Sequence, residues 1–127
     1  MGGDRPEPIL KGAAQPVKGG ATILASGGLT GKSGHTTRGS ASVQRVDGEL
    51  KVVLGSDFVF DGAPDPKVAF GKDGFLPETI LAALESNRGE QLYSVPTSLD
   101  VSKYNEIWIW CERFSVPLGV AKLTPAA

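Results

Sequence analysis

The sequence predicts an all-β domain, an antiparallel β-sandwich of the jelly-roll kind with about seven to nine short strands. One observation behind this prediction is that short runs of alternating apolar and polar residues recur, with turn residues at intervals of about 8–12 positions. Another is the dipeptide Asp47-Gly48, which joins two such runs, 40–46 and 49–55, and is the strongest short signal for a β-hairpin. We therefore expect these two runs to pair as antiparallel strands.

Further strands are expected downstream, over runs that share this alternation and end at turn residues. They are 57–61, 67–70, 91–95, 106–114 and 118–123. Two segments have another character. The segment 77–86 begins with a proline and is open to two interpretations, a short helix or a strand, while 98–105 has room for a single helical turn.

The run 106–114 is the most hydrophobic part of the chain. In an extended strand Ile107, Ile109 and Cys111 share one face, and Trp108 and Trp110 share the other. A strand that is apolar on both faces is typical of a central strand covered on both sides. We expect this run to lie at the centre of the sandwich.

The chain divides into two regions. Residues 1–28 are rich in Gly, Pro and Ala without any apolar period, which predicts a flexible leader or tether. All aromatic residues lie at Phe58 or later, so the first quarter has little to contribute to a core. Residues 29–127 are expected to form the folded domain.

Charge and residue counts exclude several classes of function. Lys and Arg total 13 against 14 Asp and Glu, so the chain lacks the cationic field that nucleic-acid binding requires. No apolar run reaches the roughly 18 residues of a transmembrane helix. With one Cys, one His and one Met, an intrachain disulfide, an iron–sulfur cluster, a c-type haem, a blue-copper site and a Cys/His zinc site are all excluded for a single chain. We expect no cofactor.

Cys111 has two interpretations. It is either a redox-active thiol or a small hydrophobic residue packed with Ile107 and Ile109. Arg113 has the same strand parity, and a neighbouring cation would favour the reactive thiolate. We favour the core interpretation, because free Cys is among the most frequently buried residue types. His35 is a candidate for a ligand-binding or structural role, although no motif orients it towards a nucleophile.

Four other aromatic residues are candidates for a site: Trp108, Trp110, Tyr93 and Tyr104. They suit either a platform that stacks on sugars or a relay for electrons, and the alternative is that they fill the core.

Three carboxylates, Asp57, Asp61 and Asp65, flank a turn and are weak candidates for calcium ligands. Asp residues around turns more often cap their own backbone, and we expect no metal elsewhere.

The order of residues resembles the DM13 domain family over about 29–123. The resemblance rests on a series of positions along the chain: His35, Gly39, Phe58, Pro64-Asp65-Pro66, Asn87-Arg88-Gly89-x-Gln91-x-Tyr93-x-x-Pro96, Tyr104, Trp110-Cys111, Phe114, Gly119 and Leu123. It implies a small extracytoplasmic β-rich domain of the bacterial single-domain type, secreted or anchored in the envelope, whose targeting segment has been removed. It also implies a non-catalytic electron-transfer role centred on Cys111, with a redox or envelope protein as the partner. The alternative is an envelope binding or interaction module in which Cys111 belongs to the core.

Overall fold

The computed structural model describes residues 15–16 and 20–126 and confirms the all-β prediction. The described residues form twelve strands and two three-residue 3₁₀ helices, and none of these helices has the length and apolar character needed to cross a membrane. The elements are β1 Gln15–Pro16, β2 Ala21–Gly31, β3 Thr37–Arg38, β4 Ser40–Val46, β5 Glu49–Leu54, β6 Val59–Phe60, β7 Pro66–Gly71, η1 Pro77–Thr79, β8 Ala82–Ala83, β9 Gln91–Ser94, η2 Val101–Lys103, β10 Glu106–Cys111, β11 Val116–Lys122 and β12 Thr124–Pro125.

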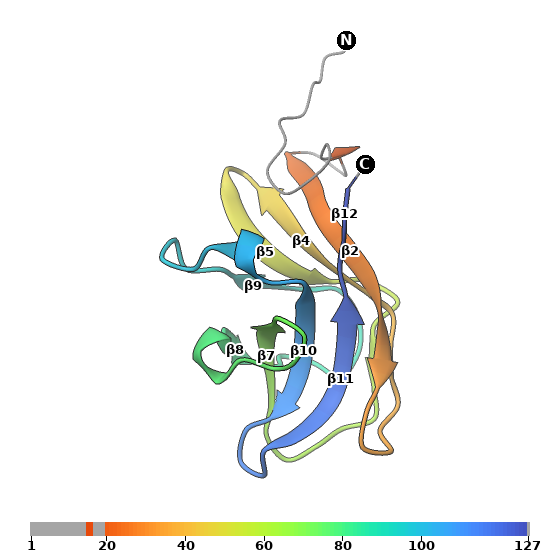
Figure 1. Ribbon diagram of the computed structural model, residues 1–127. Helices are drawn as coiled ribbons and strands as arrows, with labels where there is room; N and C mark the ends of the chain where they lie inside the picture. The colour runs from red at the N-terminus through yellow and green to blue at the C-terminus, as the bar shows by residue number, and fades with distance from the viewer. Residues whose placement is uncertain (1–14, 17–19, 127) are drawn as a thin grey trace.

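Ten of these strands form one antiparallel sheet in the order β8-β7-β10-β11-β2-β4-β5-β9, with β1 and β12 also paired to β2. The sheet curls on itself, so that the part with β7, β10 and β11 and the part with β4, β5 and β9 enclose a common core (Figure 1). The long strand β2 links the two parts: residues 21–28 pair with β4, and residues 29–31 pair with β11. A separate two-stranded ribbon is made by β3 and β6.

Side chains tie together the two strands at the ends of the sheet order, β8 and β9. The hydroxyl of Tyr93 in β9 accepts a hydrogen bond from the backbone N–H of Glu85 (2.8 Å), just beyond β8. The side-chain oxygen of Gln91 accepts one from the backbone N–H of Ser86 (3.1 Å). The sheet is therefore nearly closed.

The predicted hairpin is present. Val46 pairs with Glu49, and the two turn residues Asp47 and Gly48 have φ angles of 51° and 84°. Positive φ at both central positions is the requirement of a type I′ turn, which Asp-Gly meets at little cost. Buried side chains from both parts of the sheet and from the segments between its strands then fill the core: Leu24, Leu29, Ala41, Val43, Val52, Leu54, Phe58, Phe60, Val68, Phe70, Tyr93, Val95, Val101, Ile107, Ile109, Cys111, Leu118 and Ala121.

Regular structure begins before the boundary expected at residue 28, because β2 begins at Ala21 and buries Leu24 and Ala25. The glycine at 27 is part of this strand, where a Cβ would collide with the backbone carbonyl of Lys122. Its missing side chain thus serves close packing, not flexibility. Of the expected leader, residues 1–14 and 17–19 lie outside the described residues.

Other boundaries differ by a few residues. Both interpretations of 77–86 hold in part, since η1 supplies one 3₁₀ turn and β8 a two-residue strand. The expected turn within 98–105 is η2. The strand expected over 106–114 ends at Cys111, and only Val59–Phe60 of 57–61 is a strand.

Candidate functional site

Cys111 lies at the end of β10, and its residue is 2% exposed. It belongs to the core together with Ile107 and Ile109, as their shared strand parity predicts. The shared strand parity of Cys111 and Arg113 does not place the guanidinium beside the thiol, because β10 ends at Cys111, before Arg113. That side chain is exposed, with its guanidinium carbon 5.8 Å from the centre of the Phe114 ring.

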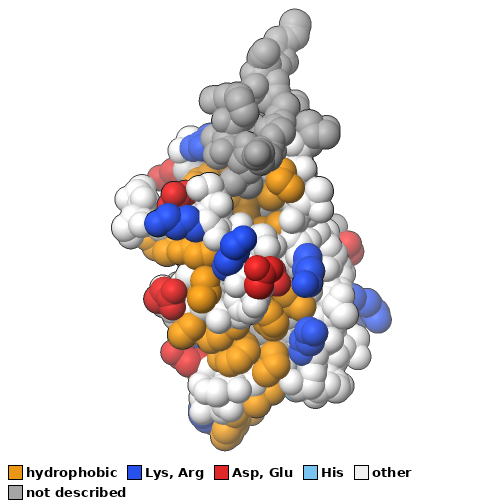
Figure 2. Space-filling model, viewed as in Figure 1, with side chains coloured by type: hydrophobic (Ala, Val, Ile, Leu, Met, Phe, Trp, Pro, Cys, Tyr) orange, Lys and Arg blue, Asp and Glu red, His pale blue; other side chains and the backbone are white. Residues whose placement is uncertain are grey.

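The opposite face of β10 carries the two tryptophans. Trp108 is 9% exposed and Trp110 is half-buried. Their ring centres are 6.2 Å apart in a T-shaped arrangement, with an interplanar angle of 82°. The ring of Phe75 stacks on Trp110 at 3.9 Å. In the view of Figure 2, hydrophobic side chains gather over the lower half of the molecule, where Figure 1 places β7, β10 and β11.

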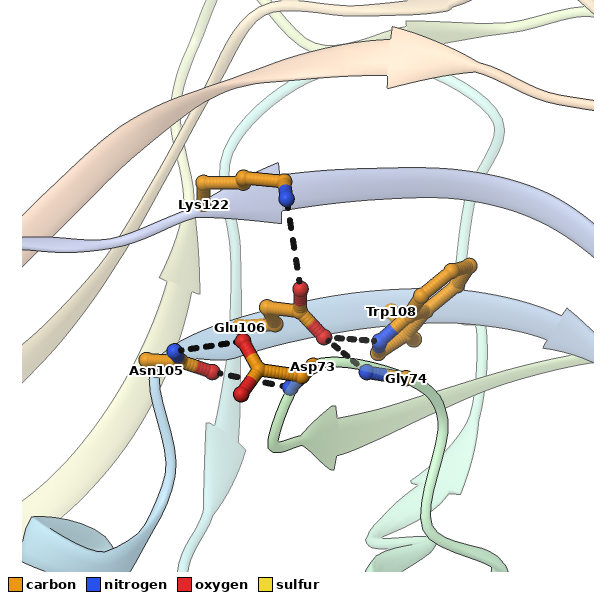
Figure 3. Close-up of polar contacts among 6 residues, drawn as sticks. All are labelled: Asp73, Gly74, Asn105, Glu106, Trp108 and Lys122. Carbon is orange, nitrogen blue, oxygen red and sulfur yellow. Dashed lines mark hydrogen bonds and ion pairs between the residues drawn. The ribbon is translucent and has the colours of Figure 1, made fainter.

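A buried carboxylate belongs to the same row of β10. Glu106 shares the parity of the two tryptophans and is 3% exposed. Its Oε1 accepts hydrogen bonds from the backbone N–H of Gly74 (2.8 Å) and from the indole N–H of Trp108 (3.0 Å), and its Oε2 lies 3.8 Å from the ammonium of Lys122 (Figure 3). We did not single out this residue from the sequence, although its spacing of two from Trp108 would have placed it on the tryptophan face.

The loop after β7 lies over this row. The side chain of Asn105 exchanges hydrogen bonds with Asp73, donating to the carboxylate (3.2 Å) and accepting from the backbone N–H (3.3 Å). At Gly71, a Cβ would collide with Nε1 of Trp108. The absence of a side chain there lets the indole lie against the strand, within reach of Glu106.

The two tyrosines lie elsewhere. Tyr93 is buried in the core, and its hydroxyl donates to the side-chain oxygen of Gln91 (2.5 Å). Burial raises the pKa of Tyr93 above its usual value. Tyr104 stacks against the core residue Phe70, with ring centres 5.3 Å apart. Of the four aromatic candidates, only Trp108 and Trp110 form a pair.

His35 is hydrogen-bonded to Asp61. The distance from Nδ1 to Oδ1 is 2.8 Å, and the second carboxylate oxygen accepts the backbone N–H of Thr36 (2.9 Å). These two groups lower the pKa of Asp61, the Thr36 N–H more than the histidine. The His35 ring centre is 5.7 Å from that of Phe60. The arrangement gives His35 a structural partner.

The three candidate calcium ligands accept hydrogen bonds from three different segments of the chain. Asp57 accepts hydrogen bonds from the backbone N–H (2.9 Å) and hydroxyl (3.0 Å) of Ser40, which lower its pKa, and Asp65 accepts one from the backbone N–H of Arg113 (2.9 Å). Asp61 is committed to the contacts with His35 and Thr36. Over the described residues, 15–16 and 20–126, no group of three or more His, Cys, Asp or Glu side chains is placed to hold a metal.

Comparison with family models identifies a family. The family model described as electron transfer DM13 matches residues 29–123, three quarters of the chain. No curated protein and no solved structure matches. The matched region includes Cys111, both tryptophans and Glu106, and it begins within β2. The resemblance seen in the sequence is confirmed, and the chain belongs to the electron transfer DM13 family.

Proposed function

We propose that this chain transfers single electrons through the aromatic row on the outer face of β10, with Trp110 as the point of exchange. The observation that carries the proposal is the continuous set of ring contacts from Phe75 through Trp110 to Trp108, which runs from a half-buried ring to one that is 9% exposed. Membership of a family described by electron transfer supports it further.

The exchange needs no bound cofactor of the chain's own. A one-electron oxidant whose potential reaches that of the indole radical couple removes one electron from the Trp110 indole, and a reduced one-electron carrier returns an electron to it. The indole ends as it began, and no bond is formed or broken. Trp is enriched in protein interfaces, because it combines a large apolar surface with a polar edge. A half-buried Trp110 suits such a transient contact.

The thiol of Cys111 is the second candidate, as the family resemblance implies. Exchange at sulfur proceeds by direct attack on another sulfur, which requires access. Burial of Cys111 in the core argues against that chemistry in the native fold. What favours a role for this residue is its place in the chain. It follows Trp110 directly in β10, so electron transfer between the indole and the sulfur would cross a single peptide unit.

We also propose that the domain works outside the cytoplasm, with a redox protein of the cell envelope as its partner. The support is the resemblance of the sequence to secreted and envelope-anchored DM13 domains. Protease protection in intact and permeabilised cells tests the location. Degradation of the protein only after the plasma membrane is opened would contradict it.

Flash oxidation tests the route. A photogenerated ruthenium(III) tris-bipyridine complex serves as the one-electron oxidant, and transient absorption identifies the oxidised side chain. We expect the spectrum of an indole radical in the native protein. The variant Tyr104→Phe is the matched control, because it changes an aromatic ring outside the tryptophan pair, and it should leave that signal intact. A tyrosyl signal that disappears in this variant would contradict the proposal.

A further inference from the structure

A hollow of about 310 Å³ lies beside the tryptophan row, on the Glu106 side. This is at the lower end of the volumes typical of small-molecule sites, about 300–1,000 Å³. It is lined by Lys32, Asp73, Gly74, Glu106, Trp108, Val120 and Lys122. These residues come from four separate segments, which the pairing of β10 with β7 and β11 and of β11 with β2 brings together.

The wall of the hollow holds one carboxylate that is fixed in place. Glu106 is 3% exposed, and its Oε1 is occupied by the N–H groups of Gly74 and Trp108. Among the described residues, the group recorded nearest its Oε2 is the ammonium of Lys122, at 3.8 Å, beyond hydrogen-bond distance (Figure 3). The Lys122 side chain is 81% exposed and so is held weakly. Oε2 therefore retains acceptor capacity on the side of the hollow.

The charges around the hollow cancel. The lining includes two basic residues, Lys32 and Lys122, and two acidic ones, Asp73 and Glu106. A wholly anionic ligand would meet the carboxylates, and a wholly cationic one would meet the lysines. A neutral molecule with several hydroxyls satisfies both, because each hydroxyl donates to a carboxylate and accepts from an ammonium. The exposed part of Trp108, a residue that is 9% exposed, adds a small apolar surface for the C–H groups of such a molecule.

We propose that this hollow is a binding site for a neutral polyhydroxylated ligand, a monosaccharide unit, with Glu106 Oε2 as its principal acceptor. The site shares Trp108 with the aromatic row, but the electron exchange is assigned to Trp110, which does not line the hollow. If no sugar binds, the proposed electron exchange at Trp110 is unaffected. If no indole radical forms, the proposed sugar site is unaffected.

Nuclear magnetic resonance of the ¹⁵N-labelled full chain provides the test. The probes are glucose, galactose, mannose and N-acetylglucosamine, with alanine as a zwitterion and glucuronate as an anion. The two indole N–H signals are assigned with the variant Trp110→Phe. We expect at least one neutral sugar to shift the Trp108 indole and the Gly74 amide in a saturable way, with a smaller effect on the Trp110 indole.

The variant Glu106→Gln preserves the shape of the side chain and removes its charge, and it should weaken the affinity about tenfold or more, because hydrogen bonds to charged groups are the strong ones. Glu90→Gln, an exposed carboxylate outside the lining, is the matched control and should bind as the native chain does. If Glu106→Gln does not fold, Lys122→Gln at the exposed rim replaces it and should also weaken binding. Each of three results would overturn the proposal. They are no saturable shift by any sugar, an unchanged affinity in Glu106→Gln or its replacement Lys122→Gln, and a response to alanine or glucuronate alone.

Discussion

The indole N–H of Trp108 donates to Oε1 of Glu106 across 3.0 Å, and the two residues are neighbours on the outer face of β10. The same oxygen receives the N–H of Gly74, so one buried carboxylate holds both the tryptophan and the loop that lies over it. Because Phe75 follows in that loop and stacks on Trp110, the position of the whole aromatic row depends on this carboxylate.

Gly71 should tolerate no side chain. The variant Gly71→Ala places a methyl group against the backbone carbonyl of Gly74 and against Nε1 of Trp108, and it should lower the free energy of unfolding by about 1–3 kcal/mol, as overpacking does. Urea unfolding measures the change. Gly28→Ala is the control, since a Cβ at that strand position meets nothing within 4 Å. Equal effects of the two substitutions would show that neither the Gly74 carbonyl nor Trp108 is packed against Gly71.

Leu24 should contribute to stability as a core residue. It lies in the part of β2 that pairs with β4 and is 3% exposed. Leu24→Ala should therefore cost about 2–5 kcal/mol, the range for large-to-small substitutions in a core. A flexible leader up to residue 28 would instead give a cost near zero, so chemical unfolding of this variant decides between the two accounts.

The contact between His35 and Asp61 should appear in the pH dependence of stability. The folded state lowers the pKa of Asp61, chiefly through the Thr36 N–H and then through His35. The carboxylate then stabilises the fold fully above about pH 4 and loses this effect as the pH falls through the lower folded-state pKa. The difference in unfolding free energy between the native chain and Asp61→Asn should shrink as the pH is lowered from about 4, the unfolded-state pKa, through the lower pKa of the folded state. A difference that stays constant over this range would refute the assignment.

The thiol of Cys111 should react slowly with DTNB in the native protein and rapidly once urea has unfolded it. Its residue is 2% exposed, so labelling has to wait for opening of the fold. An exposed reference thiol is supplied by the double variant Cys111→Ala/Ser98→Cys, because Ser98 is exposed. Native labelling as fast as in this reference would place the sulfur at the surface and favour thiol exchange.

Local patterns predicted the parts of the fold that depend on neighbouring residues. Asp47-Gly48 predicted the hairpin because the turn itself demands positive φ. Strand parity placed Cys111 with Ile107 and Ile109 in the core. The start of β2 was missed because the glycine at 27 has the composition of a linker, and its role depends on Lys122, a residue far along the chain.

The site was predicted only in part, for a related reason. The two tryptophans were candidates because aromatic side chains stand out in a sequence. Glu106 did not stand out, since one acidic residue at the start of an apolar strand is ordinary. Its burial follows from the Gly74 N–H and the Trp108 indole, and the first of these comes from a loop more than thirty residues earlier, where nothing local indicates the contact.

The most direct test of the electron route compares two variants of adjacent residues, Trp110→Phe and Cys111→Ala, by flash oxidation with the ruthenium complex. Trp110→Phe keeps a ring against Phe75 but removes the oxidisable indole at the half-buried position. We predict that this variant gives a several-fold lower yield of indole radical and that Cys111→Ala gives the yield of the native chain. An unchanged yield in Trp110→Phe together with a lost or altered signal in Cys111→Ala would contradict the account and assign the route to the thiol.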